Sequence, residues 1–360
     1  MRIKTRYNKR TKKNTLFSRK RSIAFFVFSL ACLLMIIAFL IVLDNMRVVV
    51  KNEKLAIPAM PSDLEGYSLL HISDLHGQYF GAEHVTLTDS LKGRKYNIVL
   101  VTGDLIDSAC DLDDPQKQSV IDLFTFFADE GKQVYYVLGN HDEPIVSYLR
   151  DGSVIENEFY LRLADTGAIL LDAPEQIPIG RNGYSLWLWP LGVVGLSYDE
   201  AVLMLEDGLD SDDLSYSQSL QKKQYEALVR ATDNTQPRDV SIALAHYPLT
   251  PKRLADINEQ IPEYSQALEK INLVLAGHFH GGQMRIPFFG PVFVSSTTLG
   301  NNGFFPPSEY VMGMMNISGV RQHVSGGLGS TGVGGTKLLK FRLFCPPEIS
   351  IISLTSSLAG

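Results

Sequence analysis

Cysteine is scarce in this chain of 360 residues, and its placement excludes two classes of protein. The three cysteines are Cys32, Cys110 and Cys345, of which the first lies in a long apolar run. The other two are far apart in sequence and lack metal-ligand spacing. A small disulfide-stapled domain and a thiolate metal site are therefore excluded, although a single Cys110–Cys345 bridge stays open. Internal repeats are also absent, and the length suffices for one large domain with a substantial core.

Acidic residues are missing from the first 22 positions, where ten Lys or Arg occur. Residues 1–22 therefore form a basic tail. The net charge of the whole chain is −6, so the remainder carries −16. Because no basic stripe and no groove-reading motif follows the tail, nucleic acid is not an expected partner. The tail is expected to bind anionic lipid headgroups.

Charged residues are also absent from residues 23–43, a run dominated by Phe, Leu, Ile, Val and Ala. A helix of that length spans about 31 Å, which matches the hydrocarbon core of a bilayer. A cleavable signal peptide has a shorter apolar core and an Ala-x-Ala-like cleavage site, and neither is found here. We therefore expect an uncleaved single-pass anchor in the cell membrane. The basic flank should stay in the cytoplasm, which places the C-terminal domain outside it.

Five short hydrophobic runs each end in a polar cluster rich in Asp and His. The runs are residues 67–73, 97–102, 134–138, 240–245 and 273–276. Runs of this kind, bounded by Gly, Asn or Asp, predict buried strands. Helices predicted at 119–130, 156–166 and 262–270 alternate with them, so the fold class is α/β. Open α/β sheets gather their chemistry beyond the carboxyl ends of strands, so the five clusters should meet at one rim.

The side chains expected at this rim are imidazoles, carboxylates and one amide, without a thiolate. That set favours two divalent ions of Mn, Fe, Zn or Co, with manganese preferred. Two such ions roughly 3.5–4 Å apart form the clamp used for displacement at phosphorus. One carboxylate must bridge them, and Asp104 is the candidate because Gly103 lets its backbone approach closely. Ordinary polar loops would explain any single histidine, but five of the eight lie at these strand ends.

The order of the motifs resembles the calcineurin-like metallophosphoesterase superfamily. The motifs are Asp-x-His, Gly-Asp-x-x-Asp, Gly-Asn-His-Asp, a lone His and Gly-His-x-His. Residues 277–291 (GHFHGGQMRIPFFGP), 325–329 (SGGLG) and 346–354 (PPEISIISL) look like a membrane-associated branch that includes UDP-2,3-diacylglucosamine-hydrolase-type enzymes of lipid metabolism. The resemblance covers about residues 46–355. It implies two mixed β-sheets packed as a sandwich and flanked by helices, with a dimetal site at one edge.

The resemblance also implies a role for individual residues. It assigns seven metal ligands, with Asp104 between the two ions: Asp74, His76 and His280 on one, and Asn140, His246 and His278 on the other. His141 is expected to face the leaving-group oxygen as general acid or charge stabiliser, because the pKa of an imidazole lies near neutrality. Asp107 is expected to orient His141, and Asp142 to support the site from behind.

Four segments follow from these assignments. They are a basic tail (1–22), a transmembrane helix (23–43), a linker with the first strand region (44–66) and a catalytic domain (67–357). The glycine-rich residues 325–335 form either a flexible turn before the final strand or, by the same resemblance, a backbone loop near the metal cleft. They lack the Gly-Lys-Ser/Thr of a phosphate-binding loop. Outside the site, His84 is expected at the surface.

Three functions remain open on the sequence. The first is a membrane-anchored dimetal phosphoesterase that hydrolyses a phosphoester or pyrophosphate bond with metal-activated water, on a lipid-linked or nucleotide-lipid substrate. The second is the same chemistry on a soluble phosphorylated substrate, with the anchor serving only location. The third is a non-catalytic binding protein, which the complete ligand set disfavours. The apolar residues 286–289 (IPFF) and 304–307 (FFPP) either meet an acyl chain or pack inside their loops.

Overall fold

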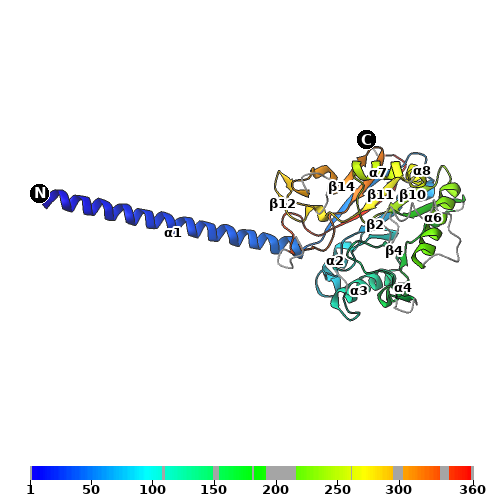
Figure 1. The fold of residues 1–360 in the computed structure, drawn as a ribbon, viewed down its shortest axis with the longest axis horizontal. Coiled ribbons are helices and arrows are strands. Elements are labelled where there is room, and N and C mark those ends of the chain that lie inside the picture. Colours follow the sequence, from blue (N-terminus) through cyan, green and yellow to red (C-terminus); the bar gives the residue numbers. More distant parts are fainter. Residues whose placement is uncertain are drawn as a thin grey trace.

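The protein consists of a long N-terminal helix and a domain built on two sheets (Figure 1). The computed structural model describes residues 2–107, 110–148, 154–180, 182–191, 216–260, 262–294, 303–332 and 340–357. Helix α1 (Arg2–Met46) projects from one end of the domain. Within α1, the stretch of residues 21–46 is long and apolar enough to cross a membrane, as a membrane anchor or a signal sequence would be.

The first sheet joins the two ends of the domain's chain. Its strand order is β1 (Val49–Ala56), β16 (Glu348–Thr355), β2 (Ser68–Ile72), β3 (Ile98–Thr102), β4 (Gln133–Val137) and β7 (Ile169–Leu170). Strand β16 runs parallel to β1 and antiparallel to β2, whereas β2, β3, β4 and β7 are mutually parallel. The carboxyl ends of β2, β3 and β4 therefore meet at one edge.

The second sheet has the same number of strands. Its order is β14 (Gly313–Ile317), β15 (Val320–Val324), β11 (Leu273–Ala276), β10 (Val240–Leu244), β9 (Tyr184–Pro190) and β8 (Glu175–Ile179). The four central strands are parallel, and the two outer ones are antiparallel to their neighbours. Two short ribbons complete the strands: β5 (Val146–Tyr148) with β6 (Val154–Glu156), and β12 (Arg285–Ile286) with β13 (Gly290–Pro291).

The alternation of side chains along the strands produces three apolar layers. In β3, Ile98 and Leu100 pack between the sheets, whereas Val99 and Val101 pack on the opposite face. This is the period of two that a strand buried on both faces requires. Between the sheets, Leu100 meets a layer that includes Ile242 of β10. Each fully buried aliphatic side chain of this kind contributes about 1.5–3 kcal/mol to folding.

Helices cover the outer faces of both sheets (Figure 1). Over the first sheet lie α2 (Val85–Leu91), α3 (Pro115–Asp129) and α4 (Glu158–Asp165), and over the second α6 (Tyr216–Asn234), α7 (Pro251–Gln260) and α8 (Pro262–Lys270). Helix α3 begins earlier than the sequence predicts, because the side chain of Asp114 accepts the amide of Gln116 at 2.9 Å and Pro115 occupies the first turn. The expected α/β sandwich flanked by helices is confirmed.

The last turn of α1 is attached to the domain by side-chain to backbone hydrogen bonds. The amide of Asn45 donates to the carbonyl of Arg342 at 2.9 Å, and its oxygen accepts the Arg342 amide at 3.1 Å. The carboxylate of Asp44 accepts the amide of Phe344. Asn45 thus satisfies both backbone groups of Arg342, and Asp44 satisfies the amide of Phe344. Together the two side chains bind segment 342–344 as a neighbouring strand would.

Candidate metal centre

The candidate ligands lie immediately beyond the ends of five parallel strands. Asp74 and His76 follow β2, Asp104 follows β3, Asn140 follows β4, His246 follows β10, and His278 and His280 follow β11. Five of them adopt left-handed backbone angles, namely Asp74, His76, Asp104, His278 and His280, with φ between 48° and 67°. Residues other than glycine adopt this conformation rarely, and such strain clusters at functional sites.

Gly103 explains why the loop after β3 can reach the loop after β4. Its φ is 83°, and a Cβ at this position would lie 2.5 Å from the amide nitrogen of Gly139. A methyl group would therefore separate the two loops. Their contact lets the Asp104 carboxylate reach the residues that follow β4, as the sequence indicates.

The first group of converging ligand atoms is buried. It consists of Asp74, His76, Asp104 and His280, whose ligand atoms all lie within 4.8 Å of one another. The Nε2 atoms of His76 and His280 are 3.2 Å apart, and Nε2 of His280 is 3.9 Å from Oδ1 of Asp74. All four side chains are at most 7% exposed, so bulk water does not separate them.

The second group shares Asp104 with the first. Asp104, His246 and His278 have ligand atoms within 4.8 Å of one another. Nε2 of His246 lies 3.2 Å from Nδ1 of His278 and 2.9 Å from the side-chain oxygen of Asn140. Oδ2 of Asp104 is 3.5 Å from Nε2 of His76 and 3.3 Å from Nε2 of His246, so one carboxylate oxygen faces both groups.

The donor set fits two divalent cations. Two nitrogens bound to one ion at right angles, each about 2.1 Å from it, lie about 3 Å apart. Both imidazole pairs have a spacing of 3.2 Å. Oδ2 of Asp74 and Oδ2 of Asp104 are buried without a hydrogen-bond partner in the described part of the chain. Buried carboxylate oxygens are costly unless a cation or a donor satisfies them, so the residues present suit a dimetal site.

Backbone carbonyls hold the outward nitrogens of the imidazoles. Nδ1 of His246 contacts the carbonyl of Thr102 at 2.9 Å, and Nδ1 of His280 contacts that of Gly329 at 3.3 Å. Because a carbonyl accepts only, the Thr102 contact places the hydrogen on Nδ1 of His246 and leaves its Nε2 as the ligand atom. Gly329 belongs to the glycine-rich segment, which lies against the site here as the resemblance implies.

Burial and charge act on these groups in opposite directions. Burial lowers the pKa of His280 well below its ordinary value, and His76 and Arg342 add to that effect. Burial acts in the same direction on His246, but the Asp104 carboxylate outweighs it and raises the pKa of His246 to about 9. Although burial opposes it, the imidazole of His246 also holds the pKa of Asp104 below its ordinary range. Asp104 is therefore ionised and able to neutralise bound cations.

His141 and Asp107 lie together at the side of the first group. Nδ1 of His141 donates to the main-chain carbonyl of Asp107 at 2.7 Å, and its own amide donates to Asp104 at 3.0 Å. A carboxylate oxygen of Asp107 lies within 4.8 Å of ring nitrogens of His76 and His141, but no hydrogen bond joins it to His141. Its nearest contacts are Nδ1 of His76 at 3.3 Å, outside hydrogen-bond geometry, and Nζ of Lys340 at 3.2 Å. Asp107 therefore contacts His141 through its backbone rather than through its carboxylate.

Asp142 lies behind the loops rather than among the ligands. Its carboxylate accepts the amides of Leu105, Ile106 and Gly139 at 2.8, 3.2 and 2.7 Å. These bonds join the loop after β3 to the loop after β4. Burial, together with the charge of Asp104, raises the pKa of Asp142 to about 7. Asp142 therefore contacts the backbone of the two loops that carry Asp104 and Asn140, and none of the ligand atoms.

Arg342 is a residue of the site that the sequence motifs do not identify. It is 1% exposed, and its guanidinium donates to the carbonyls of Gly329, Gly326 and His280 at 2.9, 2.9 and 3.3 Å. It thereby fixes the glycine-rich segment beneath His280. The sequence marks Arg342 only weakly, as a single arginine between a glycine-rich segment and the final strand.

All three cysteines, each within the described residues, are free thiols, so no Cys110–Cys345 bridge is present among them.

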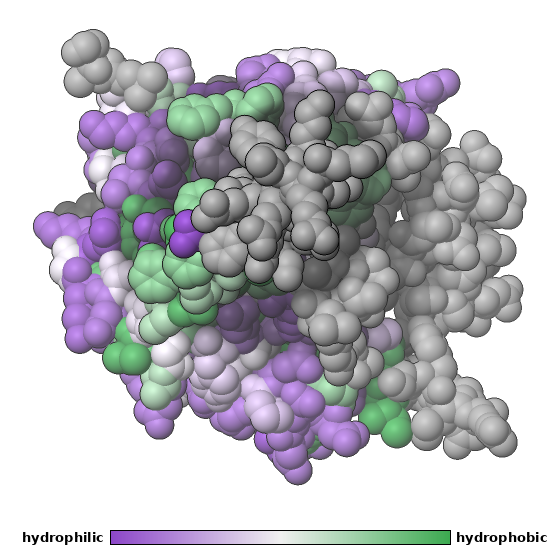
Figure 2. Space-filling model, turned by 90° about the vertical axis from the view of Figure 1, so that its left-hand side faces the viewer, coloured by the Kyte–Doolittle hydropathy of each residue, from purple (hydrophilic) through white to green (hydrophobic). Residues whose placement is uncertain are grey.

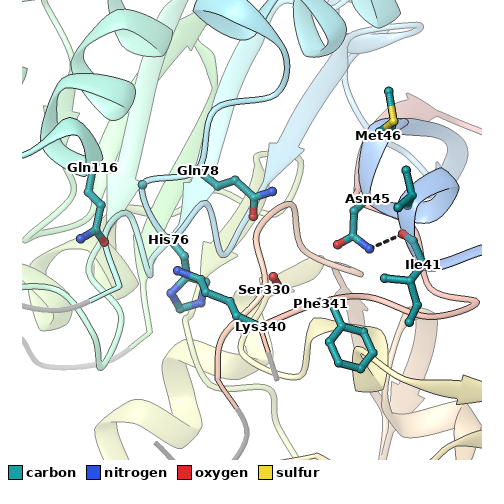
Figure 3. Close-up of a pocket in the computed structure, with 11 residues that line it drawn as sticks. Ile41, Asn45, Met46, His76, Gln78, Gln116, Ser330, Lys340 and Phe341 are labelled. Carbon is teal, nitrogen blue, oxygen red and sulfur yellow. Dashed lines mark hydrogen bonds between the residues drawn. The ribbon is translucent and has the colours of Figure 1, made fainter. Parts of the chain in front are cut away.

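A cavity of about 490 Å³ extends from the first group to the end of α1 (Figure 3). The domain lines it with His76, Gly77, Gln78, Gln116, Ser330, Lys340 and Phe341. Helix α1 lines it with Ile41, Val42, Asn45 and Met46. Figure 3 shows His76 and Lys340 facing this space from one side and the α1 residues from the other.

Comparison with known proteins places the chain in a family. The family model of calcineurin-like phosphoesterases matches residues 67–282, more than half of the chain. An uncharacterized metallophosphoesterase of Bacillus subtilis (strain 168), YkuE, is 28% identical over 305 residues, which cover 83% of this chain and 82% of that protein. The uncharacterized protein YpbG of the same organism is 23% identical over 80% of each chain. The crystal structure of phosphopantetheinyl hydrolase from Mycobacterium tuberculosis has a TM-score of 0.36 and 16% identity, covering 72% of this chain and 89% of that one.

Proposed function

Because the chain belongs to the calcineurin-like phosphoesterase family and is a metal-dependent phosphoester hydrolase, we propose that it cleaves a phosphoester or pyrophosphate bond in a lipid-linked substrate at a membrane surface. Helix α1 is then an uncleaved anchor, with the basic tail in the cytoplasm and the catalytic domain outside it. The observation that carries this proposal is the cavity, because His76 and apolar residues of α1 line the same space.

The position of the cavity along α1 supports a lipid-linked substrate. Ile41 and Val42 belong to the last turn of the uncharged run 23–43. If α1 spans the bilayer, that turn stands at the edge of the hydrocarbon core. A phosphorylated headgroup can then approach His76 while its acyl chain stays beside α1. A small soluble substrate would make no use of this apolar wall.

The side chains of the site suit hydrolysis at phosphorus. Two divalent ions, for which we favour manganese, would be held by Asp74, His76, Asp104, Asn140, His246, His278 and His280, and would supply Lewis-acid polarisation and an acidified water. The carbonyl of Asp107 orients the His141 ring by accepting from Nδ1. Nε2 of His141 is then the ring atom that delivers a proton to the leaving-group oxygen.

Lys340 adds a positive charge at the mouth of the site. Its Nζ lies 3.2 Å from Oδ2 of Asp107, and its side chain is 30% exposed and lines the cavity. An ammonium group in this position can contact an anionic phosphate that approaches from α1. We assign Lys340 to substrate binding.

The test of this proposal compares two substrates that differ only in their acyl chains. The full chain is reconstituted in vesicles with Mn²⁺, and kcat/KM is measured for a phosphoester of diacylglycerol and for the same phosphoester of glycerol. We expect preference for the acylated form. Ile41→Trp should reduce that preference by narrowing the cavity, whereas Ile36→Trp, on the exposed surface of α1, should not.

Two other outcomes would identify the alternatives. Equal kcat/KM on both substrates would indicate a soluble substrate and an anchor that serves location alone. A protein that binds two metal ions yet hydrolyses no member of a panel of phosphomonoesters, phosphodiesters and pyrophosphates would be a binding protein.

The orientation of the domain has a separate test. A reporter enzyme fused after Gly360 should be active only when the assay reads the extracytoplasmic side. Activity in the cytoplasm from a correctly inserted fusion would reverse the proposed topology and leave the hydrolase chemistry untouched.

A further inference from the structure

Four phenylalanines are exposed in the region between β11 and β14, which contains the two-stranded sheet of β12 and β13. Phe288 and Phe289 form the turn between β12 and β13, and they are 107% and 84% exposed. Phe304 and Phe305 lie on the adjacent segment and are 53% and 64% exposed. We call residues 283–294 together with 303–305 the aromatic ribbon. So much uncovered aromatic surface in one place is unusual for a protein surrounded by water alone.

The aromatic ribbon is one continuous structure. Strands β12 and β13 pair in antiparallel fashion. Residues 292–294 pair in turn with 303–305, since the amide of Phe305 donates to the carbonyl of Val292 at 2.9 Å and that of Val294 to Gly303 at 2.9 Å. The rings of Phe293 and Phe304 are 5.0 Å apart. The four exposed rings therefore belong to one hydrogen-bonded backbone unit.

The backbone presents two of these rings at a conformational cost. Phe288 and Phe305 have φ angles of 70° and 47°, in the left-handed region that glycine favours. Exposed turns with this geometry normally carry Gly, Asn or Asp. Since neither ring is buried in the domain, packing inside the domain does not explain why phenylalanine occurs at these two positions. An apolar environment outside the domain would explain it.

The aromatic ribbon lies beside the attachment of α1. Its Arg285 amide donates to the carbonyl of Leu343 at 3.0 Å, and the Leu343 amide donates to Gln283 at 3.0 Å. The neighbours of Leu343 on both sides hydrogen-bond to Asn45 and Asp44 of α1. Phe344 also lines a hollow of about 310 Å³ with Phe288 and Phe289. One segment thus connects the last turn of α1 to the exposed rings.

The aromatic ribbon and α1 lie at the same end of the domain. In Figure 1, β12 lies at the end of the domain from which α1 projects. Figure 2 looks at that face and shows hydrophobic residues among hydrophilic ones there. The apolar run of α1 ends at Leu43, directly before the residues that hold segment 342–344. A bilayer around that run would bring its interface against the aromatic ribbon.

We infer that the aromatic ribbon inserts into the interfacial layer of the bilayer leaflet that α1 enters on the domain side. Phenylalanine is among the residues that bury an apolar face at the headgroup boundary. This second contact, together with α1, would fix the tilt of the domain on the membrane. The inference rests on α1 being a membrane anchor, as proposed above, but not on the hydrolysis of any substrate.

The test places single tryptophans in the full chain. The protein has two native tryptophans, Trp187 and Trp189, which are 5% and 1% exposed and give a steady background. Phe288→Trp and Phe305→Trp report on the aromatic ribbon, and Phe39→Trp on α1. Leu161→Trp, on α4 at the far side of the first sheet, is the matched exposed control. Each variant is reconstituted in vesicles of phosphatidylcholine and phosphatidylglycerol, with lipids brominated near the headgroup or near the chain end.

We expect bromines near the headgroup to remove most of the added fluorescence of Phe288→Trp and Phe305→Trp, and none of that of Leu161→Trp. Phe39→Trp, about 6 Å inside the domain-side end of the apolar run, should also be quenched, and the deeper bromines should act on it more than on the ribbon tryptophans. Unquenched ribbon tryptophans beside a quenched Phe39→Trp would overturn the inference and retain the anchor. A blue-shifted but unquenched Phe288→Trp would mean that protein, such as a second copy, covers the ribbon. An unquenched Phe39→Trp would instead remove the anchor on which the inference rests.

Discussion

The metal-ligand loops and the aromatic ribbon both place residues other than glycine in the left-handed region, but in opposite environments. In the loops these residues are polar and mostly buried, as Asp74 and His76 are. In the ribbon they are apolar and exposed, as Phe288 and Phe305 are. Within its described residues, the domain itself supplies no partner for the buried carboxylate oxygens of the loops and no apolar cover for the rings of the ribbon. We infer that bound cations satisfy the first set and that lipid covers the second.

The largest expected effect is the loss of the shared carboxylate in the loops. Asp104→Asn should abolish metal binding and activity together, because Oδ2 of Asp104 faces both groups. Loss of a supporting residue around a metal costs about 10–100-fold, so loss of the bridging ligand should exceed that. Metal content by mass spectrometry and hydrolysis rate decide the matter, with Asp89→Asn on exposed α2 as control. Two bound metals and normal turnover would exclude Asp104 from the site.

The next effect separates chemistry from metal binding. His141→Ala should keep both ions, because the ligand atoms of the two groups come from other residues. Its rate should fall about 10²–10⁴-fold on esters with basic alkoxide leaving groups, the usual contribution of a positioned acid or base. The loss should shrink on p-nitrophenyl esters, whose leaving group scarcely needs a proton. Equal losses on both substrates would argue against proton donation, and loss of metal would make His141 a ligand or a support.

A smaller effect, on stability, is expected at Asp142, which joins the loops after β3 and β4. Asp142→Asn turns one accepting oxygen into an NH₂ group that faces the backbone amides of residues 105, 106 or 139. A buried donor left without an acceptor costs about 1–3 kcal/mol, so the free energy of unfolding should drop by that amount. Urea unfolding of the metal-free protein measures it. Unchanged stability would show that these loops are held by other contacts.

The smallest effect is expected in the aromatic ribbon. Phe288→Ser with Phe289→Ser should change the free energy of unfolding in detergent by less than about 0.5 kcal/mol, as surface substitutions usually do. A drop of several kcal/mol would mean that the rings pack within the domain, and the contrast with the loops would disappear. The same urea titration as for Asp142→Asn gives a direct comparison of the two regions.

Local sequence patterns were sufficient for the strands and for the residues that follow them. Each of the five hydrophobic runs forms a strand, because β-branched residues bounded by glycine or asparagine leave few alternatives. The polar residues beyond them converge because parallel strands share an edge. Helix limits are predicted less accurately: α3 begins at Pro115 rather than at residue 119, because the Asp114 cap starts the helix ahead of its apolar residues.

Contacts between distant segments could not be predicted in this way. Arg342 and Lys340 enter the site from the far end of the chain, where no periodicity or spacing marks them. The expected surface position of His84 is wrong: its side chain is buried, and Nε2 contacts the carbonyl of Ser119 at 2.8 Å. The sequence does not decide whether residues 286–289 meet an acyl chain or pack inside their loop, because their exposure depends on what the fold brings next to them.

The pairing of β16 has a consequence for how the chain is made. Strand β16 lies between β1 and β2, and its eight residues pair with all eight of β1. While the chain is being synthesised, β1 and β2 have already emerged, but the strand that joins them has not. The first sheet therefore cannot close until residues 348–355 have left the ribosome, and contacts of such wide sequence separation form late. Until then β1 and β2 lie in an unfinished sheet, and the domain acquires its complete sheet only after β16 has been added.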